Sequence, residues 1–426
     1  MGRPTSCLCV LLFCGILTAG ELTPAQKQLN IDSFEHVWKK VRDTHWDPKL
    51  GGVDWQAVHD EFRPAVEHAE TMAEARKAMS DMLGKLHQTH FGIIPVDAYR
   101  EVGEKSAGGE EGRSGIDVRV VGGQALVRSV DEDSPAAKAG VRAGWLILRI
   151  NGKDVAATID TVGDAYRNST LRDMMLSRAI TSRLNADLGD KIRVQFLDGS
   201  DKKVELEIAE APPRGARSKF GLLPAQHVWV ESRKLAGNVG YIAFNMFLDP
   251  ARLMPAFEEA IKSFRDCDGI VIDIRGNPGG IGIMAMGLAG WFIDQQGRRL
   301  GTMLTRETPI KFVVNPRFPT FRRPVAILVD GASASTSEIF AGGMQDLKRA
   351  RIFGTRTAGA ALPSFIEMLP NGDGFQCATA NYVSEGGKPL EGIGVIPDAE
   401  APPTRASLLA GKDAAIESAI HWIHNQ

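Results

Sequence analysis

The stretch Val325–Phe340, V-A-I-L-V-D-G-A-S-A-S-T-S-E-I-F, decides the fold of the chain around it. It opens with the aliphatic run Val325–Val329, which is short and apolar enough to be a strand buried on both faces. The chain then breaks at Asp330-Gly331 and enters a helical segment, Glu338–Leu347. A strand, a tight turn and a helix N-terminus together offer unpaired N–H groups and positive potential to a nucleophile and its developing oxyanion.

Three alternate serines, Ser333, Ser335 and Ser337, occupy this junction. One interpretation is a reactive hydroxyl. The other is an S-x-x-E capping box formed by Ser335 and Glu338, which starts a helix without any chemistry. This stretch alone favours the capping box.

Further residues resemble a known family. The segment S-A-S-T-S-E-I-F-A-G, followed by Gly354-Thr355-Arg356-Thr357, resembles the nucleophile segment of the C-terminal processing peptidases, the tail-specific serine proteases. The resemblance implies that Ser335 is the nucleophile. Members with a Ser-Lys dyad have G-x-x-T-x-G-K here, whereas this chain has Ala360 in place of the lysine, so we do not expect that dyad.

A serine hydroxyl needs a base within hydrogen-bond reach, and histidine suits neutral pH. Leu86–His90 resembles the L-G-x-S-H segment of the tricorn-like branch, with His87 in place of its glycine and Thr89 in place of its serine. Leu390–Asp398 resembles that branch's E-x-x-G-V-x-P-D segment. The resemblance therefore implies His90 as base and Glu391 as orienting carboxylate, directly or through Thr89.

The turn Arg275–Gly280, R-G-N-P-G-G, follows an apolar strand and resembles the family's D-x-R-x-N-x-G-G segment. There the resemblance implies an oxyanion hole formed by the N–H of Gly279 or Gly280 and that of Thr336. The same glycines also satisfy the dinucleotide fingerprint G-x-G-x-x-A. Pro278 and the early position of Asp294 argue against that alternative, and we expect no cofactor.

Two segments resemble a PDZ domain: Ser114–Val118, and Asp133–Gly152 with its short helix, glycine turn and strand. Such domains bind an extended peptide as an added strand and hold its terminal carboxylate with backbone N–H groups. The resemblance implies that the loop Gly115, Ile116, Asp117 and Val118 binds peptide. An insertion holds an amphipathic helix around Leu171–Leu184 that covers the groove or packs on it.

The fold class expected is multidomain α+β. We predict a signal peptide (1–20), a helical domain (21–101), a PDZ-like β-rich domain with a helical insertion (112–212) and an α/β, crotonase-like ββα protease core (217–426), with Gly103–Arg113 as a linker.

Residues 1–20 carry Arg3, then the apolar run Cys7–Leu17, then small residues, the pattern of an export signal. We therefore expect a periplasmic or extracellular protein that is not membrane-embedded after signal removal. Only Cys267 and Cys377 would remain, which permits one disulfide bridge but no framework.

A formal net charge of −2 gives no electrostatic reason to bind nucleic acid. His87 and His90 have an H-x-x-H spacing without a third ligand nearby, so we expect no metal.

The function expected is an exported serine endopeptidase that acts on protein or peptide substrates near their C-terminus, with a homo-oligomer possible. One alternative is a non-catalytic peptide or ligand binder of the same fold, which Ala360 would fit. Another is an esterase, which the broken elbow Gly331-Ala332-Ser333 disfavours because Ser335 stands where that motif needs glycine.

Overall fold

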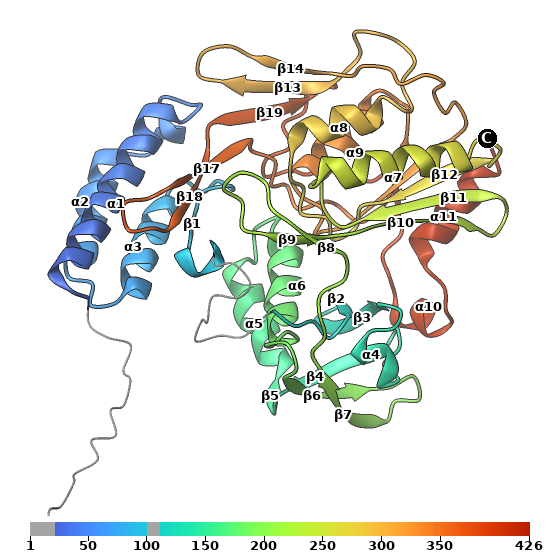
Figure 1. Ribbon diagram of the computed structural model, residues 1–426, viewed down its shortest axis with the longest axis horizontal. Coiled ribbons are helices and arrows are strands. Elements are labelled where there is room, and N and C mark those ends of the chain that lie inside the picture. The colour runs from blue at the N-terminus through green and yellow to red at the C-terminus, as the bar shows by residue number, and fades with distance from the viewer. Residues whose placement is uncertain (1–21, 100–110) are drawn as a thin grey trace, which may run out of the picture.

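The computed structural model describes residues 22–99 and 111–426, which form three parts. The N-terminal helices and a small β-rich part each lie beside a larger α/β core (Figure 1). The predicted signal at 1–20, and residues 103–110 of the predicted linker, lie outside the described residues. Within the described part, no helix combines the length and the apolar character needed to cross a membrane.

The N-terminal part consists of α1 (Pro24–Thr44), α2 (Trp55–Glu67) and α3 (Met72–Gly84), with a 3₁₀ turn at Leu50–Gly52. Capping boxes at Thr23 and Thr71 start α1 and α3. Trp38 and Trp55 each donate an indole N–H to the other's carbonyl, at 2.9 and 3.0 Å, so α1 and α2 are fixed to each other inside a buried cluster.

The β-rich part has one sheet in the order β2-β3-β4-β6-β7, with the short β5 paired to β4. The amphipathic helix expected around Leu171–Leu184 is α6. The helix before it, α5, was not predicted. The strands are β2 (Ile116–Val121), β3 (Gln124–Val130), β4 (Leu146–Ile150), β5 (Lys153–Asp154), β6 (Lys191–Leu197) and β7 (Lys203–Ala209), and the helices are α4 (Pro135–Lys138), α5 (Val155–Ala165) and α6 (Arg172–Arg183).

The core is built on a six-stranded sheet in the order β10-β11-β12-β15-β16-β20, parallel except for β10. The predicted strand Val325–Val329 is β15, and it is buried on both faces. The other strands are β10 (Val230–Leu235), β11 (Val239–Phe244), β12 (Gly269–Asp273), β16 (Arg351–Gly354) and β20 (Ala399–Glu400).

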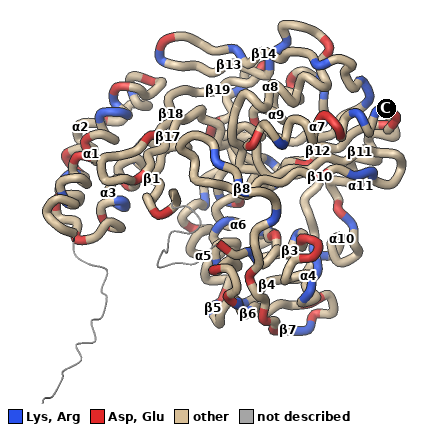
Figure 2. Tube along the Cα trace, viewed as in Figure 1, with Lys and Arg blue, Asp and Glu red and all other residues tan. Residues whose placement is uncertain are grey.

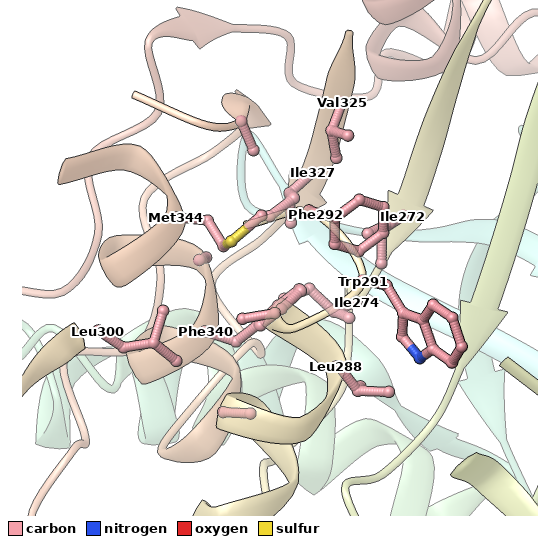
Figure 3. Packing of buried hydrophobic residues seen from close by; sticks show 14 of the residues in the cluster. Ile272, Ile274, Leu288, Trp291, Phe292, Leu300, Val325, Ile327, Phe340 and Met344 are labelled. Carbon is pink, nitrogen blue, oxygen red and sulfur yellow. The ribbon is translucent and has the colours of Figure 1, made fainter. Parts of the chain in front are cut away.

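Alternate residues of β15 point to opposite faces of this sheet, as the strand period requires. Ile327 belongs to the cluster under α7 (Pro250–Ser263), α8 (Gly282–Ala289) and α9 (Thr336–Asp346), part of which Figure 3 shows with Phe292, Phe340 and Met344. Ala326 and Leu328 belong to the opposite cluster, under α11 (Ala414–Ile423). Helix α9 begins at Thr336, two residues before Glu338, where the sequence predicted the helix to start.

One of the smaller sheets joins the N-terminal helices to the core. The sheet β1-β18-β17 pairs β1 (Gly92–Ile94), which follows the N-terminal helices and precedes a 3₁₀ turn (Val96–Tyr99), with the core hairpin β17 (Ser364–Met368) and β18 (Gly374–Ala378). The remaining elements are β8 (Ala216–Ser218), β9 (Gln226–Val228), β13 (Arg299–Thr305), β14 (Ile310–Val313), β19 (Ala380–Ser384) and α10 (Arg405–Leu409).

The two described cysteines do not form the bridge that the sequence permitted. Cys267 lies in the core cluster under α7, whereas Cys377 lies in the cluster of the N-terminal helices, and both are buried and free. Basic and acidic residues are interspersed along the chain in all three parts (Figure 2).

Candidate active site

Ser335 stands at the turn between β15 and α9 with a backbone conformation that is rare for a residue with a side chain, φ 56° and ψ −120°. Such a conformation costs on the order of 1–3 kcal/mol and persists only when its surroundings hold it. Here the Ser335 N–H donates to the Ala360 carbonyl at 2.7 Å and to Glu338 Oε2 at 3.0 Å. The turn is therefore fixed from two sides.

The three serines of the junction have different partners. Ser333 donates its hydroxyl to the Ile274 carbonyl at 2.8 Å, and Ser337 donates its hydroxyl to the Asn277 carbonyl at 2.9 Å. Both are fully buried. Ser335 is half-buried, and its hydroxyl faces the Glu338 N–H in the capping box but donates its proton to no atom among residues 22–99 and 111–426. It is the hydroxyl of the three that remains available.

Glu338 does more than cap α9. This fully buried carboxylate accepts hydrogen bonds from the Thr357 hydroxyl at 2.5 Å, Gly359 N–H at 2.8 Å and Ala360 N–H at 2.9 Å, besides that of Ser335. Burial raises the pKa of Glu338 to about 7, and these donors oppose the rise. The capping-box pattern identified the residue, but not its second role of fixing the 357–360 loop beside Ser335.

The glycine turn lies directly against the serine. A Cβ at Gly279, whose φ is 96°, would lie 2.7 Å from Ser335 Cβ and 2.8 Å from the Thr336 nitrogen. The Gly279 N–H donates to Asn277 Oδ1 at 2.9 Å. By contrast, the N–H groups of Gly280 and Thr336 donate to no atom in the described part of the chain. Of the two glycines, Gly280 is thus the one whose N–H is unengaged.

His90 lies after α3 in a half-buried loop, with a φ of 61°. Its Nδ1 is 2.8 Å from the Thr89 hydroxyl, which donates to Glu391 Oε2 at 2.9 Å, and the Thr89 N–H donates to Glu391 Oε1 at 2.8 Å. The connection between histidine and glutamate therefore runs through Thr89. Burial, with the charge of Arg178, lowers the pKa of His90 to about 4. Burial also raises the pKa of Glu391.

A buried histidine that sequence reasoning did not single out supports this loop. His45 Nε2 lies 2.8 Å from Gln88 Oε1, and its ring stacks on Phe91 with centroids 5.8 Å apart. The residues on both sides of Thr89 and His90 are thus held by His45, the C-cap residue of α1. This contact was not predicted because His45 and Gln88 are 43 positions apart and belong to no common motif.

One peptide group connects the two halves of the site. The Ala360 carbonyl accepts from the Ser335 N–H, and the N–H of Ala361, in the same peptide, donates to Glu391 Oε2 at 3.0 Å. No hydrogen bond joins His90 to Ser335 within the described residues. Ala360, which stands in place of the dyad lysine, is buried.

The predicted peptide-binding loop lies at the start of β2, in contact with the core. Gly115 has a φ of 82°, and Asp117 pairs with Arg119 at 2.5 Å and with Arg128. Arg119 also donates to Asp330 Oδ2 at 2.7 Å. Asp330 Oδ1 in turn accepts from the N–H groups of Gly276 and Ala332, at 2.8 and 3.0 Å. Ile116 and Val118 are buried, so their side chains are not available to a ligand.

The H-x-x-H spacing does not form a metal site here. His87 is exposed, and no cluster of three potential ligands occurs in residues 22–99 and 111–426.

Family models match three segments of the chain. Residues 238–401 match peptidase family S41, residues 32–84 match the tricorn protease C1 domain and residues 126–172 match a PDZ domain. These segments correspond to the core, the N-terminal helices and the β-rich part.

Curated relatives have related names. The chain is 29% identical over 301 residues to a carboxy-terminal-processing protease of Bartonella bacilliformis, covering 69% of this chain and 62% of that one. It is 26% identical over 405 residues to a carboxyl-terminal-processing protease of a Picosynechococcus species, covering 93% and 89%.

Solved structures share the fold. The photosystem II D1 C-terminal processing protease superposes with a TM-score of 0.57 at 21% identity, covering 94% of this chain and 97% of that one. Mature CPAF superposes with a TM-score of 0.65 at 15% identity, covering 94% and 99%.

Proposed function

Because the chain belongs to family S41 of the serine peptidases, among the carboxyl-terminal-processing proteases, we propose that it hydrolyses protein or peptide substrates with Ser335 as the nucleophile. One observation carries this proposal. Of three alternate serines, two have their hydroxyls bound to main-chain carbonyls, whereas Ser335 has a strained backbone and an available hydroxyl. A strained backbone and a hydroxyl proton without an acceptor suit a nucleophile, and the capping box that Ser335 forms with Glu338 at the start of α9 is compatible with that role.

The hydrogen bonds around Thr89 define where the proton of Ser335 would go. Ionised Glu391 can only accept, so the single hydroxyl proton of Thr89 is donated to it. The Thr89 oxygen must then accept from Nδ1–H of His90. This leaves the lone pair on Nε2 of His90 to take the proton of Ser335 and later give it to the leaving amine.

The negative charge of the tetrahedral intermediate would be stabilised by the N–H groups of Thr336 and Gly280. Both are unengaged in the described chain; Thr336 follows Ser335 directly, and Gly280 follows Gly279, where an added Cβ would lie 2.7 Å from Ser335 Cβ. Gly279 serves the site through its missing side chain, because its N–H is already bound to Asn277. The hydrogen bond from the Ser335 hydroxyl to His90 would form when substrate binds and closes the site, because catalytic hydrogen bonds commonly shorten in the bound state.

Substrate recognition near a C-terminus is a second part of the proposal. The backbone of Gly115–Val118 would hold the terminal residues, and Arg119 connects that strand with Asp330 beside the nucleophile turn. We also propose export through residues 1–20, which N-terminal sequencing of the secreted or periplasmic protein would test: an intact Met1 in the mature protein contradicts it.

The proposed chemistry can be tested by labelling the full chain with an alkyl fluorophosphonate. We expect Ser335→Ala to abolish labelling and His90→Ala to slow it by a factor of roughly 10⁴. Ser337→Ala, in the first turn of α9, should label at the wild-type rate. Absence of labelling in the folded wild type would favour the non-catalytic binder instead, an alternative that the processing-protease names of the relatives do not favour.

A further inference from the structure

Helix α6 lies between the β-rich part and the nucleophile turn, and its two opposite faces have different partners. Leu176, Ile180 and Leu184 pack into the core of the β-rich part. On the opposite side, Met174, with Leu171 and Met175, packs against Ala334, Ala358 and Ala360 around Ser335, together with Ala332. The inserted helix therefore forms one wall of the candidate active site.

Arg178 extends from the wall that faces the serine. It follows Met174 by four positions and Met175 by three, so the helical period places it on the same face, one turn farther along. Its charge acts on His90 strongly enough to contribute to the lowered pKa of that imidazole. Arg178 thus lies between the helix, the His90 loop and the nucleophile turn.

Arg178 has no partner of its own. Neither a hydrogen bond nor an ion pair reaches it from residues 22–99 or 111–426. The other arginines of the helix differ: Arg172 lies 4.0 Å from Asp173, and Arg183 binds main-chain carbonyls and Thr158. The side chain is exposed, yet surrounding protein lowers the pKa of its guanidinium, because partial burial disfavours the charged form.

We propose that Arg178 is a specificity-determining residue that pairs with a carboxylate of the substrate beside the scissile bond. The guanidinium presents a planar set of donors that matches a carboxylate, and a partly desolvated cation without a partner gains most from one. The inference rests on the proposed function, since it names the substrate class of that same site.

Pairing would also assist the proposed reaction. An unpaired cation near His90 opposes formation of the imidazolium when Ser335 loses its proton. A substrate carboxylate on Arg178 neutralises that charge, so the same contact that selects the substrate makes His90 a better proton acceptor. An acidic side chain and a free C-terminal carboxylate offer the same chemistry, and the test below separates them.

The test selects peptides with the Ser335→Ala protein, which retains the site but cannot cleave. Immobilised full chain is incubated with random decapeptides, in one arm with amidated C-termini and in the other with free ones, and the retained peptides are sequenced. We expect Asp or Glu to be enriched roughly tenfold at one position of the amidated pool, or the free termini to be retained roughly tenfold over the amides.

The variant Arg178→Gln in the same background should remove the enrichment, and Arg178→Lys should restore part of it. Arg167→Gln is the matched control, because Arg167 lies in the same insertion but pairs with Asp164 on the exposed surface. Selection that is indifferent to carboxylates, unchanged by Arg178→Gln, or absent altogether would overturn the inference.

A second readout separates this inference from the proposed function. With the Ser335-intact protein, Arg178→Gln should reduce kcat/KM for selected acidic peptides about tenfold more than for their Asn or Gln analogues. An equal change for both peptides, with only a shifted pH profile, would show that Arg178 merely tunes His90 and would overturn the inference. Carboxylate selection by a protein that never cleaves would instead contradict the proposed function alone.

Discussion

At the scale of single residues, the candidate site depends on one hydroxyl. Thr89 is the sole connection observed between His90 and Glu391 in the described chain, with its oxygen 2.8 Å from the imidazole and 2.9 Å from the carboxylate. A two-step connection of this kind fixes the tautomer of His90 as a direct carboxylate would, because each proton on the path has one acceptor.

Replacing Thr89 by valine should therefore lower kcat by a factor of roughly 10 to 100 while leaving KM nearly unchanged, since valine keeps the shape but cannot orient the imidazole. Thr89→Ser retains the hydroxyl and should retain most of the rate. Steady-state kinetics on a peptide substrate distinguish the two variants. Equal rates for both would show that the hydroxyl does not orient His90.

The pH profile follows from the lowered pKa of His90. Burial and Arg178 on α6 disfavour the imidazolium, whereas Glu391, acting through Thr89, faces it from the other side. A general base works when neutral, so kcat/KM should stay level as the pH falls through 6.5 and decline only near 4. Stability moves in the same direction, because the unfolded chain binds this proton first and the fold loses stability between pH 6.5 and 4.

The measurement is kcat/KM between pH 3.5 and 8, with circular dichroism to separate unfolding from titration. A decline centred on the ordinary histidine pKa would contradict the environment described for His90.

Sequence reasoning reached the residues that lie within motifs and missed those that act through space. Ser335, His90 and Glu391 were predicted because each occurs in a recognisable segment. Glu338 was identified only as a cap, since nothing local shows that Thr357, Gly359 and Ala360 fold onto it. Arg178 had no signal at all, because an unpaired arginine is visible only when all its neighbours are known.

At the scale of elements, two turns determine the geometry around the serine. The Arg275–Gly280 turn follows β12 and the Asp330–Ser335 turn follows β15, and these strands are parallel neighbours. Their carboxyl ends therefore meet at one edge of the sheet, the usual location of sites in such folds. Asp330 holds the two turns together through Gly276 and Ala332.

Gly279→Ala should disable the site while the rest of the fold survives. Its added Cβ would clash with Ser335 Cβ at 2.7 Å, so the nucleophile or the oxyanion turn must move. We expect kcat to fall by at least a factor of about 100, the usual cost of losing one oxyanion donor. Gly297→Ala is the control: its φ of 77° is similarly unfavourable for alanine, but the Cβ would meet no atom within 4 Å. Comparable kinetics for the two variants would contradict the proposed role of the turn.

The order and type of the elements could largely be predicted, because β15, α9 and the strands before them have strong apolar patterns. The sheet β1-β18-β17 could not. Its strand β1 has three residues, and it pairs with a hairpin more than 270 positions away through backbone hydrogen bonds that leave no mark on side-chain identity.

At the scale of the whole molecule, the proposed base His90 and the proposed nucleophile Ser335 belong to different parts, so their relative position depends on how the parts dock. Arg76 on α3 donates two hydrogen bonds to the fully buried Asp373 of the core hairpin, at 2.9 and 2.7 Å. The N–H of Val96 also donates to Asp373. This contact fixes the helices that carry His90 against the hairpin.

Arg76→Ala should cost roughly 3–5 kcal/mol of unfolding free energy, because it leaves a buried carboxylate without its counter-charge. It should also reduce fluorophosphonate labelling of the molecules that remain folded. Lys77→Ala, next in sequence but in an exposed pair with Asp81, should change stability by no more than about 0.5 kcal/mol. Urea unfolding gives both values. An Arg76→Ala protein as stable as Lys77→Ala would show that the docking does not depend on this pair.

The separation of His90 from Ser335 also has a consequence for biosynthesis. The serine follows the histidine by 245 positions (335 − 90), and Glu391 follows later still. A ribosome adding about 5–20 residues per second needs roughly 10 to 50 s to cover that interval. Throughout it, the growing polypeptide has His90, the proposed base, without Ser335, the proposed nucleophile, and β1 has no β18 to pair with. If Ser335, His90 and Glu391 act as proposed, nascent and prematurely terminated products cannot cut, and activity arises only after the segment with Glu391 has been translated.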